Sequence, residues 1–101
     1  MIALDTEATG LDVHHGCLPF FVTFCDDQMR QTFFEWPVNP KTRIPEVDVA
    51  DLPLIREMIY EADKLVLHNA KFDAHMLQAL FEKYDEDFIF PWDKVEDTLL
   101  A

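Results

Sequence analysis

The chain has 101 residues, of which 50% are hydrophobic and 13% aromatic, and its formal net charge is −12. This apolar content suffices for the core of one small domain and argues against intrinsic disorder. A surface this acidic repels nucleic acid unless metal ions or a neighbouring basic domain intervene. The charge therefore argues against an independent DNA-binding protein, and it fits a site that concentrates cations.

Cysteine usage and hydropathy predict the compartment. Cys17 and Cys25 are too few for a disulfide scaffold and lack the spacing of a zinc site, so we expect free thiols in a reducing compartment. The N-terminal apolar stretch is too short for a signal peptide, and no run approaches the ~20 apolar residues of a membrane span. We expect a cytoplasmic protein that does not contact a membrane.

The first half of the chain predicts three strands. Residues 1–5 form a short apolar run, and residues 18–24 and 32–36 are rich in the aromatic and β-branched side chains that favour strands. A tight turn at 26–28 would make the second and third strands antiparallel neighbours. Three prolines between 37 and 45 then predict an irregular crossover.

The second half predicts helices that alternate with a strand. Apolar residues recur at helical spacing over 51–61 and again over 69–84, with a short apolar strand over 64–68 between them. Asp51 and Asn69 are candidate N-caps of the two helices, because their short polar side chains can accept hydrogen bonds from unpaired amides.

Together these elements predict an α/β fold. The order is three strands, a helix, a strand, a helix and, with Asp97 as its expected cap, the start of another helix. Three antiparallel strands followed by a β-α-β-α pattern predict a mixed sheet flanked by helices, with one parallel crossover. No linker divides the chain, so we expect residues 1–101 to belong to a single domain.

Two short motifs place acidic side chains at predicted strand ends. Asp5 and Glu7 are two residues apart on the first strand, and strand alternation points both to the same side. Asp73 follows the fourth strand, in the first turn of the next helix. If these strands are adjacent, the three carboxylates converge at the sheet edge where open α/β sheets bind ligands. Acid pairs of the same spacing at 46 and 48, 61 and 63, and 85 and 87 lack such a second motif.

Three converging carboxylates are unfavourable without a cation, because like charges raise each other's pKa. Such oxygen donors suit Mg²⁺ or Mn²⁺. Two of these ions, ~3.5–4 Å apart, clamp the attacking water and the leaving oxygen of a phosphodiester. The pattern therefore predicts metal-dependent phosphodiester hydrolysis without a covalent enzyme intermediate. Asp73 and Asn69 also have structural explanations, as a first-turn acid and a helix cap.

The same residues carry a family resemblance. Asp5-Thr6-Glu7 with Gly10-Leu11, and Asn69-x-x-Phe72-Asp73, resemble the first two motifs of the DEDD 3′→5′ exonucleases. The segment Asp97-Thr98-Leu99-Leu100-Ala101 resembles the proofreading domain of family A DNA polymerases, especially phage-like ones. The resemblance implies a ribonuclease-H-like fold. It also implies a 3′→5′ exonuclease that hydrolyses single-stranded DNA 3′ ends for a polymerase domain in the same or an associated chain.

The resemblance assigns roles to individual residues. Asp5 would bridge both metals, Glu7 would bind one near the attacking water, and Asp73 would act mainly through a water on the second. Asp97 would support the site without binding metal directly. Substrate contacts, with Leu11 as a wedge against the terminal bases, are implied for Thr6, Gly10, Leu11, Asn69 and Phe72.

One part of the family pattern is missing. The family has a fourth acid, preceded four residues earlier by a Tyr or His that orients the water, on a helix beyond the position of Asp97. Because the chain ends at Ala101, we expect a C-terminally truncated exonuclease domain with an incomplete two-metal site. By itself it would bind metal weakly and be nearly inactive.

Two other functional classes stay open. A stand-alone DEDD exonuclease acting on RNA or short oligonucleotides would carry the same two motifs. A non-catalytic interaction domain is the other, because a face left uncovered without the last helix would favour a partner, a swapped dimer or aggregation. The aromatic residues between 20 and 36 are expected in the core, although an exposed remainder would support base stacking.

Overall fold

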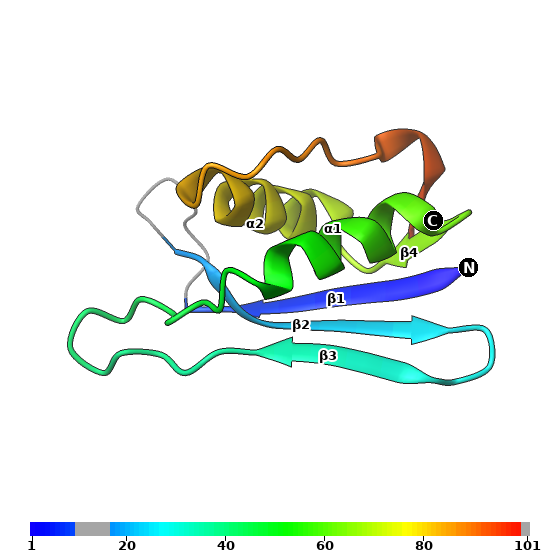
Figure 1. Ribbon diagram of the computed structural model, residues 1–101. Helices are drawn as coiled ribbons and strands as arrows, with labels where there is room; N and C mark the ends of the chain where they lie inside the picture. The colour runs from blue at the N-terminus through cyan, green and yellow to red at the C-terminus, as the bar shows by residue number, and fades with distance from the viewer. Residues whose placement is uncertain (10–16, 100–101) are drawn as a thin grey trace.

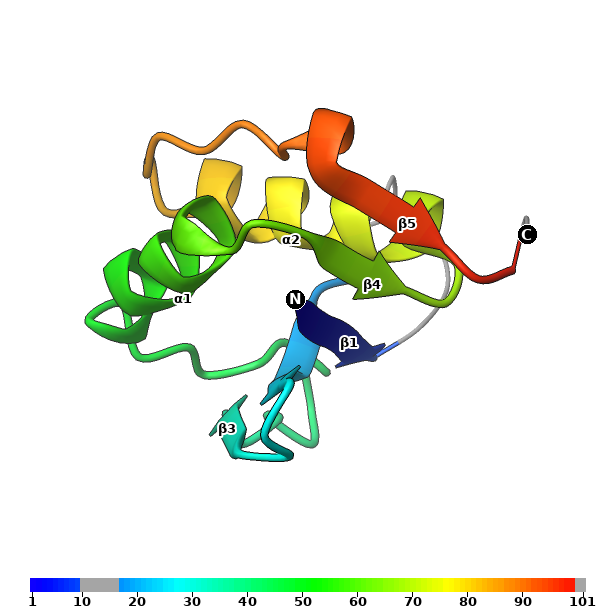
Figure 2. The ribbon, with the colours of Figure 1, turned by 90° about the vertical axis from the view of Figure 1, so that its right-hand side faces the viewer.

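The computed structural model describes residues 1–9 and 17–99. They form a five-stranded sheet with the strand order β3-β2-β1-β4-β5 and two α-helices (Figures 1 and 2). The elements are β1 Ile2–Ala8, β2 Pro19–Asp26, β3 Gln31–Glu35, α1 Asp51–Glu61, β4 Leu65–Leu67, α2 Ala70–Lys83, a short 3-10 helix Trp92–Lys94, and β5 Val95–Asp97. Neither α-helix in this part of the chain has the length and apolarity needed to cross a bilayer.

The sheet is mixed. β2 pairs antiparallel with both β1 and β3, whereas β4 pairs parallel with β1 on one side and with β5 on the other. In Figure 2 the arrows of β1, β4 and β5 accordingly point the same way. The predicted α/β class with a mixed sheet is confirmed, and the arrangement is compatible with a ribonuclease-H-like fold.

Both helices lie on one face of the sheet, above β1, β2 and β3 in Figure 1. The strands alternate accordingly: Val22 and Phe24 on β2 are buried toward the helices, while Thr23 between them is only half-buried. Each helix contributes apolar residues at helical spacing to the same core, namely Leu52, Ile55, Ile59, Ala70, Ala74, Leu77, Leu80 and Phe81. The opposite face of the sheet is not covered by any element within the described residues.

One predicted boundary was wrong because hydrogen-bonded pairing overrides local propensity: the first strand does not end at residue 5, since its ladder with β2 continues to Ala8. The structure also has a strand that was not predicted, β5, whose parallel pairing with β4 adds a second parallel crossover. The helix expected after Asp97 would extend into residues 100–101, outside the described part of the chain, and stays a prediction. Only three residues form β5, too few for a period to be visible in the sequence.

The predicted cap of α1 was also wrong. Ala50 occupies the N-cap position and makes no side-chain cap hydrogen bond. The carboxylate of Asp51 instead accepts a hydrogen bond from the indole Nε1 of Trp36, at 2.9 Å. Because Trp36 is buried, its N–H needs a partner, and Asp51 supplies it from the first turn of the helix.

We expect Phe81→Ala to lower the free energy of unfolding by about 3–5 kcal/mol, because it leaves a cavity in the core. The ring of Phe81 is fully buried and stacks on Phe88, with ring centroids 4.3 Å apart. Ile89→Ala is the control: this side chain is 80% exposed, so its change should stay within about 0.5 kcal/mol. Urea denaturation followed by circular dichroism measures both, and equal losses would contradict the assignment of the core.

Candidate active site

Asp5 and Glu7 lie on the uncovered face of β1. Both are exposed, while Leu4 and Thr6 alternate with them and are buried beneath the helices. The predicted common side for the two acids is therefore confirmed. β4 pairs with β1 only at Ile2 and Ala3, so Asp5 lies beyond the carboxyl end of β4. The β1–β2 register shifts after Glu7, a bulge of the kind that often lies beside functional sites.

Asp73 lies on α2 and is buried against β1, with 2% of its surface exposed. The hydroxyl Oγ1 of Thr6 donates a hydrogen bond of 2.6 Å to Asp73 Oδ1. The second oxygen, Oδ2, is buried and has no hydrogen-bond partner within the described residues. A buried carboxylate oxygen without a partner is rare in folded proteins and marks a site where an ion or water can bind.

The pKa of Asp73 is raised to about 6, mainly by burial and to a smaller extent by the negative charges of Asp5 and Asp97, while hydrogen bonding to Thr6 opposes the shift. The influence of Asp5 means that these two carboxylates are near each other. Asp5 Oδ1 itself accepts a hydrogen bond of 3.0 Å from the backbone N–H of Thr6. One residue of β1 therefore restrains both acids, one through its hydroxyl and the other through its amide.

The start of α2 is held by a residue distant in sequence. Asn69 occupies the predicted N-cap position, in a left-handed conformation (φ 74°), but its side chain does not make the expected cap hydrogen bond. Asp97 performs this role: its two oxygens accept hydrogen bonds from the backbone N–H of Asn69 (3.1 Å) and of Ala70 (2.9 Å). The unpaired amides at a helix start favour such a negative charge.

The charge of Asp97 is stabilised where it lies. Although desolvation acts in the opposite direction, hydrogen bonds from the backbone N–H groups of Ala70, Leu99 and Asn69 hold the pKa of Asp97 below its usual value. The next residue, Thr98, donates its backbone N–H to Leu67 O at 2.8 Å, and its hydroxyl lies 3.1 Å from His68 Nδ1. These contacts of Thr98 with the end of β4 were not predicted, because they depend on β5, a strand that the sequence pattern does not indicate.

The structure brings some predicted site residues together and not others. Asp5, Asp73 and Asp97 form a group of interacting charges, and Glu7 shares the open face with Asp5. Within residues 1–9 and 17–99, however, no three His, Cys, Asp or Glu side chains are close enough to hold a metal ion. Phe72 is half-buried on α2. Gly10 and Leu11 lie outside the described residues, so their roles stay predictions.

A shallow depression of about 370 Å³ opens on the uncovered face beside Asp5. Small or polar side chains from three neighbouring strands form most of its surface. Its lining consists of Ala3, Leu4, Asp5, Thr23, Cys25, Val66, Leu67, His68 and Thr98. Asp5 is thus the one candidate carboxylate that lines this depression.

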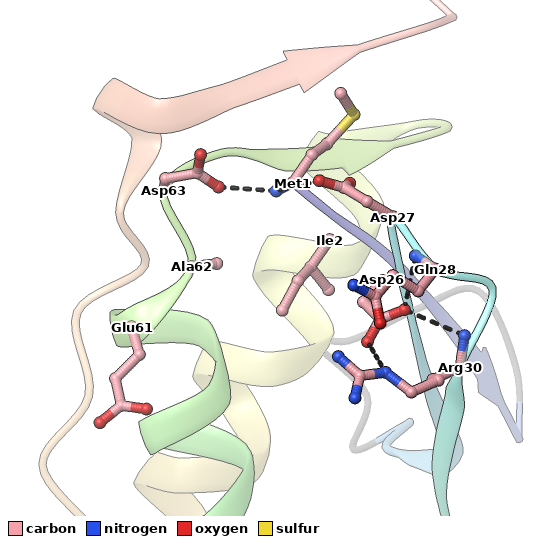
Figure 3. A pocket seen from close by; sticks show the side chains of 9 residues that line it. All are labelled: Met1, Ile2, Asp26, Asp27, Gln28, Arg30, Glu61, Ala62 and Asp63. Carbon is pink, nitrogen blue, oxygen red and sulfur yellow. Dashed lines mark hydrogen bonds and ion pairs between the residues drawn. The ribbon is translucent and has the colours of Figure 1, made fainter.

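A second depression, of about 320 Å³, lies at the other end of β1 (Figure 3). Three of its four acids have cationic partners: the amino group of Met1 lies 2.7 Å from Asp63 and 3.5 Å from Asp27, and Arg30 Nε lies 2.8 Å from Asp26. The hydrogen bond from this amino group lowers the pKa of Asp63.

The chain shows a partial similarity to a phage DNA polymerase. No known protein-family model matches it. It is 29% identical over 79 residues to the DNA polymerase DpoZ of Salmonella phage PMBT28. The similar segment covers 78% of this chain, and the chain spans only 11% of the length of that polymerase. The similarity supports a polymerase-related origin for the chain.

The buried Asp73 makes stability depend on pH. The pKa of Asp73 is about 6 in the folded chain and about 3.9 when unfolded, so its protonated form favours folding below pH ~4. This contribution, roughly 3 kcal/mol, should be lost as the pH rises from about 4 through 6 in metal-free buffer. Asp73→Asn should remove it, so the difference in unfolding free energy between the two chains should change with pH. A constant difference from pH 4 to pH 8 would refute this account.

Asp97→Ala should loosen the start of α2. The amides of Asn69 and Ala70 would lose their acceptors, and hydrogen exchange measured by NMR should become faster at these two positions than elsewhere in α2. Asp97→Asn should have a smaller effect because one oxygen remains as an acceptor. Asp93→Ala serves as the control, since it removes a nearby exposed carboxylate that is not hydrogen-bonded to these amides. Unchanged exchange in Asp97→Ala would contradict the capping role.

Proposed function

We propose that this chain is a 3′→5′ exonuclease domain that hydrolyses phosphodiester bonds at single-stranded DNA 3′ ends, as the proofreading part of a DNA polymerase. The observation that carries the proposal is the buried Asp73, whose Oδ2 has no hydrogen-bond partner among the described residues and whose Oδ1 is held by Thr6 of β1. The similarity to a phage DNA polymerase and the motifs Asp5-Thr6-Glu7 and Phe72-Asp73 support the same function.

The donor set suits hard divalent cations. Asp73 Oδ2 is a buried oxygen without a protein partner, and a cation there would satisfy it and offset its repulsion with Asp5. Asp5, Glu7 and Asp73 carry the carboxylate oxygens that Mg²⁺ and Mn²⁺ prefer. Because no three such acids of the described residues lie within reach of one ion, a cation there would draw its remaining ligands from water and from the substrate phosphate. When bound, two such ions supply an activated water and stabilise the leaving oxygen of the phosphodiester.

The other residues of the site act by positioning. Thr6 restrains Asp73 through its hydroxyl and Asp5 through its amide, so the two carboxylates keep a fixed relation to β1. Asp97 fixes the turn from β4 into α2 and thereby the place of Asp73 on the first turn of that helix. The depression beside Asp5 would give the terminal nucleotide access to the open face.

The acidic surface determines where the rest of the DNA would bind. With a net charge of −12, the chain repels phosphates except where cations neutralise its carboxylates. We infer that the basic surface that carries the single strand belongs to the polymerase domain, in the same or an associated chain. The site on this chain would then bind the 3′ end through its cations.

Isothermal titration calorimetry with Mn²⁺ tests the proposal directly. The wild-type chain should bind Mn²⁺, and Asp5→Ala and Asp73→Asn should each weaken binding at least tenfold, because both carboxylates donate to the same site. Binding should also release protons near pH 6, since Mn²⁺ requires the ionised form of Asp73.

Glu46→Ala is the matched control, because Glu46 and Asp48 have the same spacing as Asp5 and Glu7 but no partner motif. It should leave the Mn²⁺ affinity unchanged. If Asp5→Ala, Asp73→Asn and Glu46→Ala lose Mn²⁺ affinity equally, or if Asp5→Ala loses none, general surface charge holds the cations and the proposal fails.

A further inference from the structure

The uncovered face of the sheet carries an exposed aromatic pair. Phe21 on β2 and Phe33 on β3 have ring centroids 5.9 Å apart and planes inclined at 36°. The side chain of Phe33 is 62% exposed, and Phe21 is half-buried. Their sequence neighbours Val22 and Phe34 point the other way, into the core. The expectation that the aromatics of this region are core residues therefore fails for Phe33.

Strand register places this pair beside the candidate carboxylates. Phe21 is directly opposite Glu7 across the β1–β2 ladder, and Thr23 is opposite both Asp5 and Phe33. Since neighbouring strands lie about 4.8 Å apart, Phe21 is one strand from Glu7, and Phe33 is two strands from Asp5. The two acids and the two rings therefore occupy one continuous patch of the same face.

The charges around the rings select the occupant. Glu7 and Glu35 flank Phe21 in register, so a second copy of this chain would bring its own acids against the same acids. An acidic protein surface would be repelled in the same way. The phosphates of a nucleic acid are repelled as well unless cations at Asp5 neutralise them, but a nucleobase is flat and uncharged, and every base has a π-face that can stack on an aromatic ring.

We propose that Phe33 and Phe21 form a stacking surface for an unpaired base of the single-stranded substrate, next to the carboxylates that receive its 3′ end. The inference rests on the proposed function for the placement of the 3′ end. The base would stack on the exposed ring of Phe33, while its phosphates would be directed to the cations at Asp5. Stacking of this kind tolerates any base, which suits an enzyme that removes nucleotides regardless of sequence.

The test is fluorescence anisotropy with a short fluorescein-labelled oligothymidylate, made with phosphorothioate linkages to resist hydrolysis, in the presence of Mn²⁺. Phe33→Ala should bind this probe about tenfold more weakly than the wild-type chain, and Phe33→Trp should bind at least as tightly. Ile89→Ala removes an equally exposed apolar side chain far from the patch and should have no effect. The Mn²⁺ affinity of Phe33→Ala, measured without oligonucleotide, should equal that of the wild-type chain.

Probes with single abasic positions make the test specific. At the stacked position, removing the base should weaken wild-type binding about as much as Phe33→Ala does, and should weaken Phe33→Ala binding no further. Additive losses at every position would overturn the inference. So would unchanged affinity in Phe33→Ala, absence of probe binding by the wild-type chain, or a Phe33-dependent dimer in sedimentation with unchanged probe affinity.

The two proposals fail in different ways. If Asp5→Ala keeps its Mn²⁺ affinity while Phe33→Ala still loses the probe at one base, the exonuclease proposal fails and the stacking surface stands. If Asp5→Ala loses Mn²⁺ while Phe33→Ala binds the probe normally, only the stacking surface is refuted.

Discussion

The hydrogen bond from Thr6 to the buried carboxylate of Asp73 is the contact on which the site depends. It joins the central strand to α2, and it satisfies one oxygen of a carboxylate that desolvation otherwise penalises. The other oxygen has no partner among the described residues, so the site is polar, buried and incomplete without a further group. Such an arrangement costs stability in the absence of a ligand, and it prepares an oxygen donor for one.

The one-sided sheet gives the chain two unlike surfaces. The helices cover one face and complete the core there, while the other face presents acids, small polar residues and the Phe21–Phe33 pair. Negative charge on that face discourages contact with other acidic surfaces, and divalent cations would convert the same charge into affinity for phosphate. An acidic chain of this kind could bind an anionic polymer only if metal ions formed part of its binding surface.

Much of this arrangement could be predicted from the sequence. Strand alternation over Asp5, Thr6 and Glu7 predicts that the two acids lie on the same side of β1. The helical spacing of apolar residues predicts α1 and α2. Contacts between distant segments could not be predicted: β5 exists because it pairs with β4, and the carboxylate of Asp51 is occupied by Trp36. Thr6 was assigned to the substrate by resemblance, whereas its place on the buried face of β1 already pointed toward α2. The exposure of Phe33 depends on the register between β2 and β3, which the amino-acid composition of the segment cannot predict.

The dependence of α2 on Asp97 also orders events during synthesis. The amides of Asn69 and Ala70 receive their acceptors from a residue 28 and 27 positions later. While a ribosome is still translating the intervening residues, these amides can bind only water or other groups, and β4 lacks its β5 neighbour. The cap of α2 therefore forms only after Asp97 has been synthesised and β5 has paired with β4.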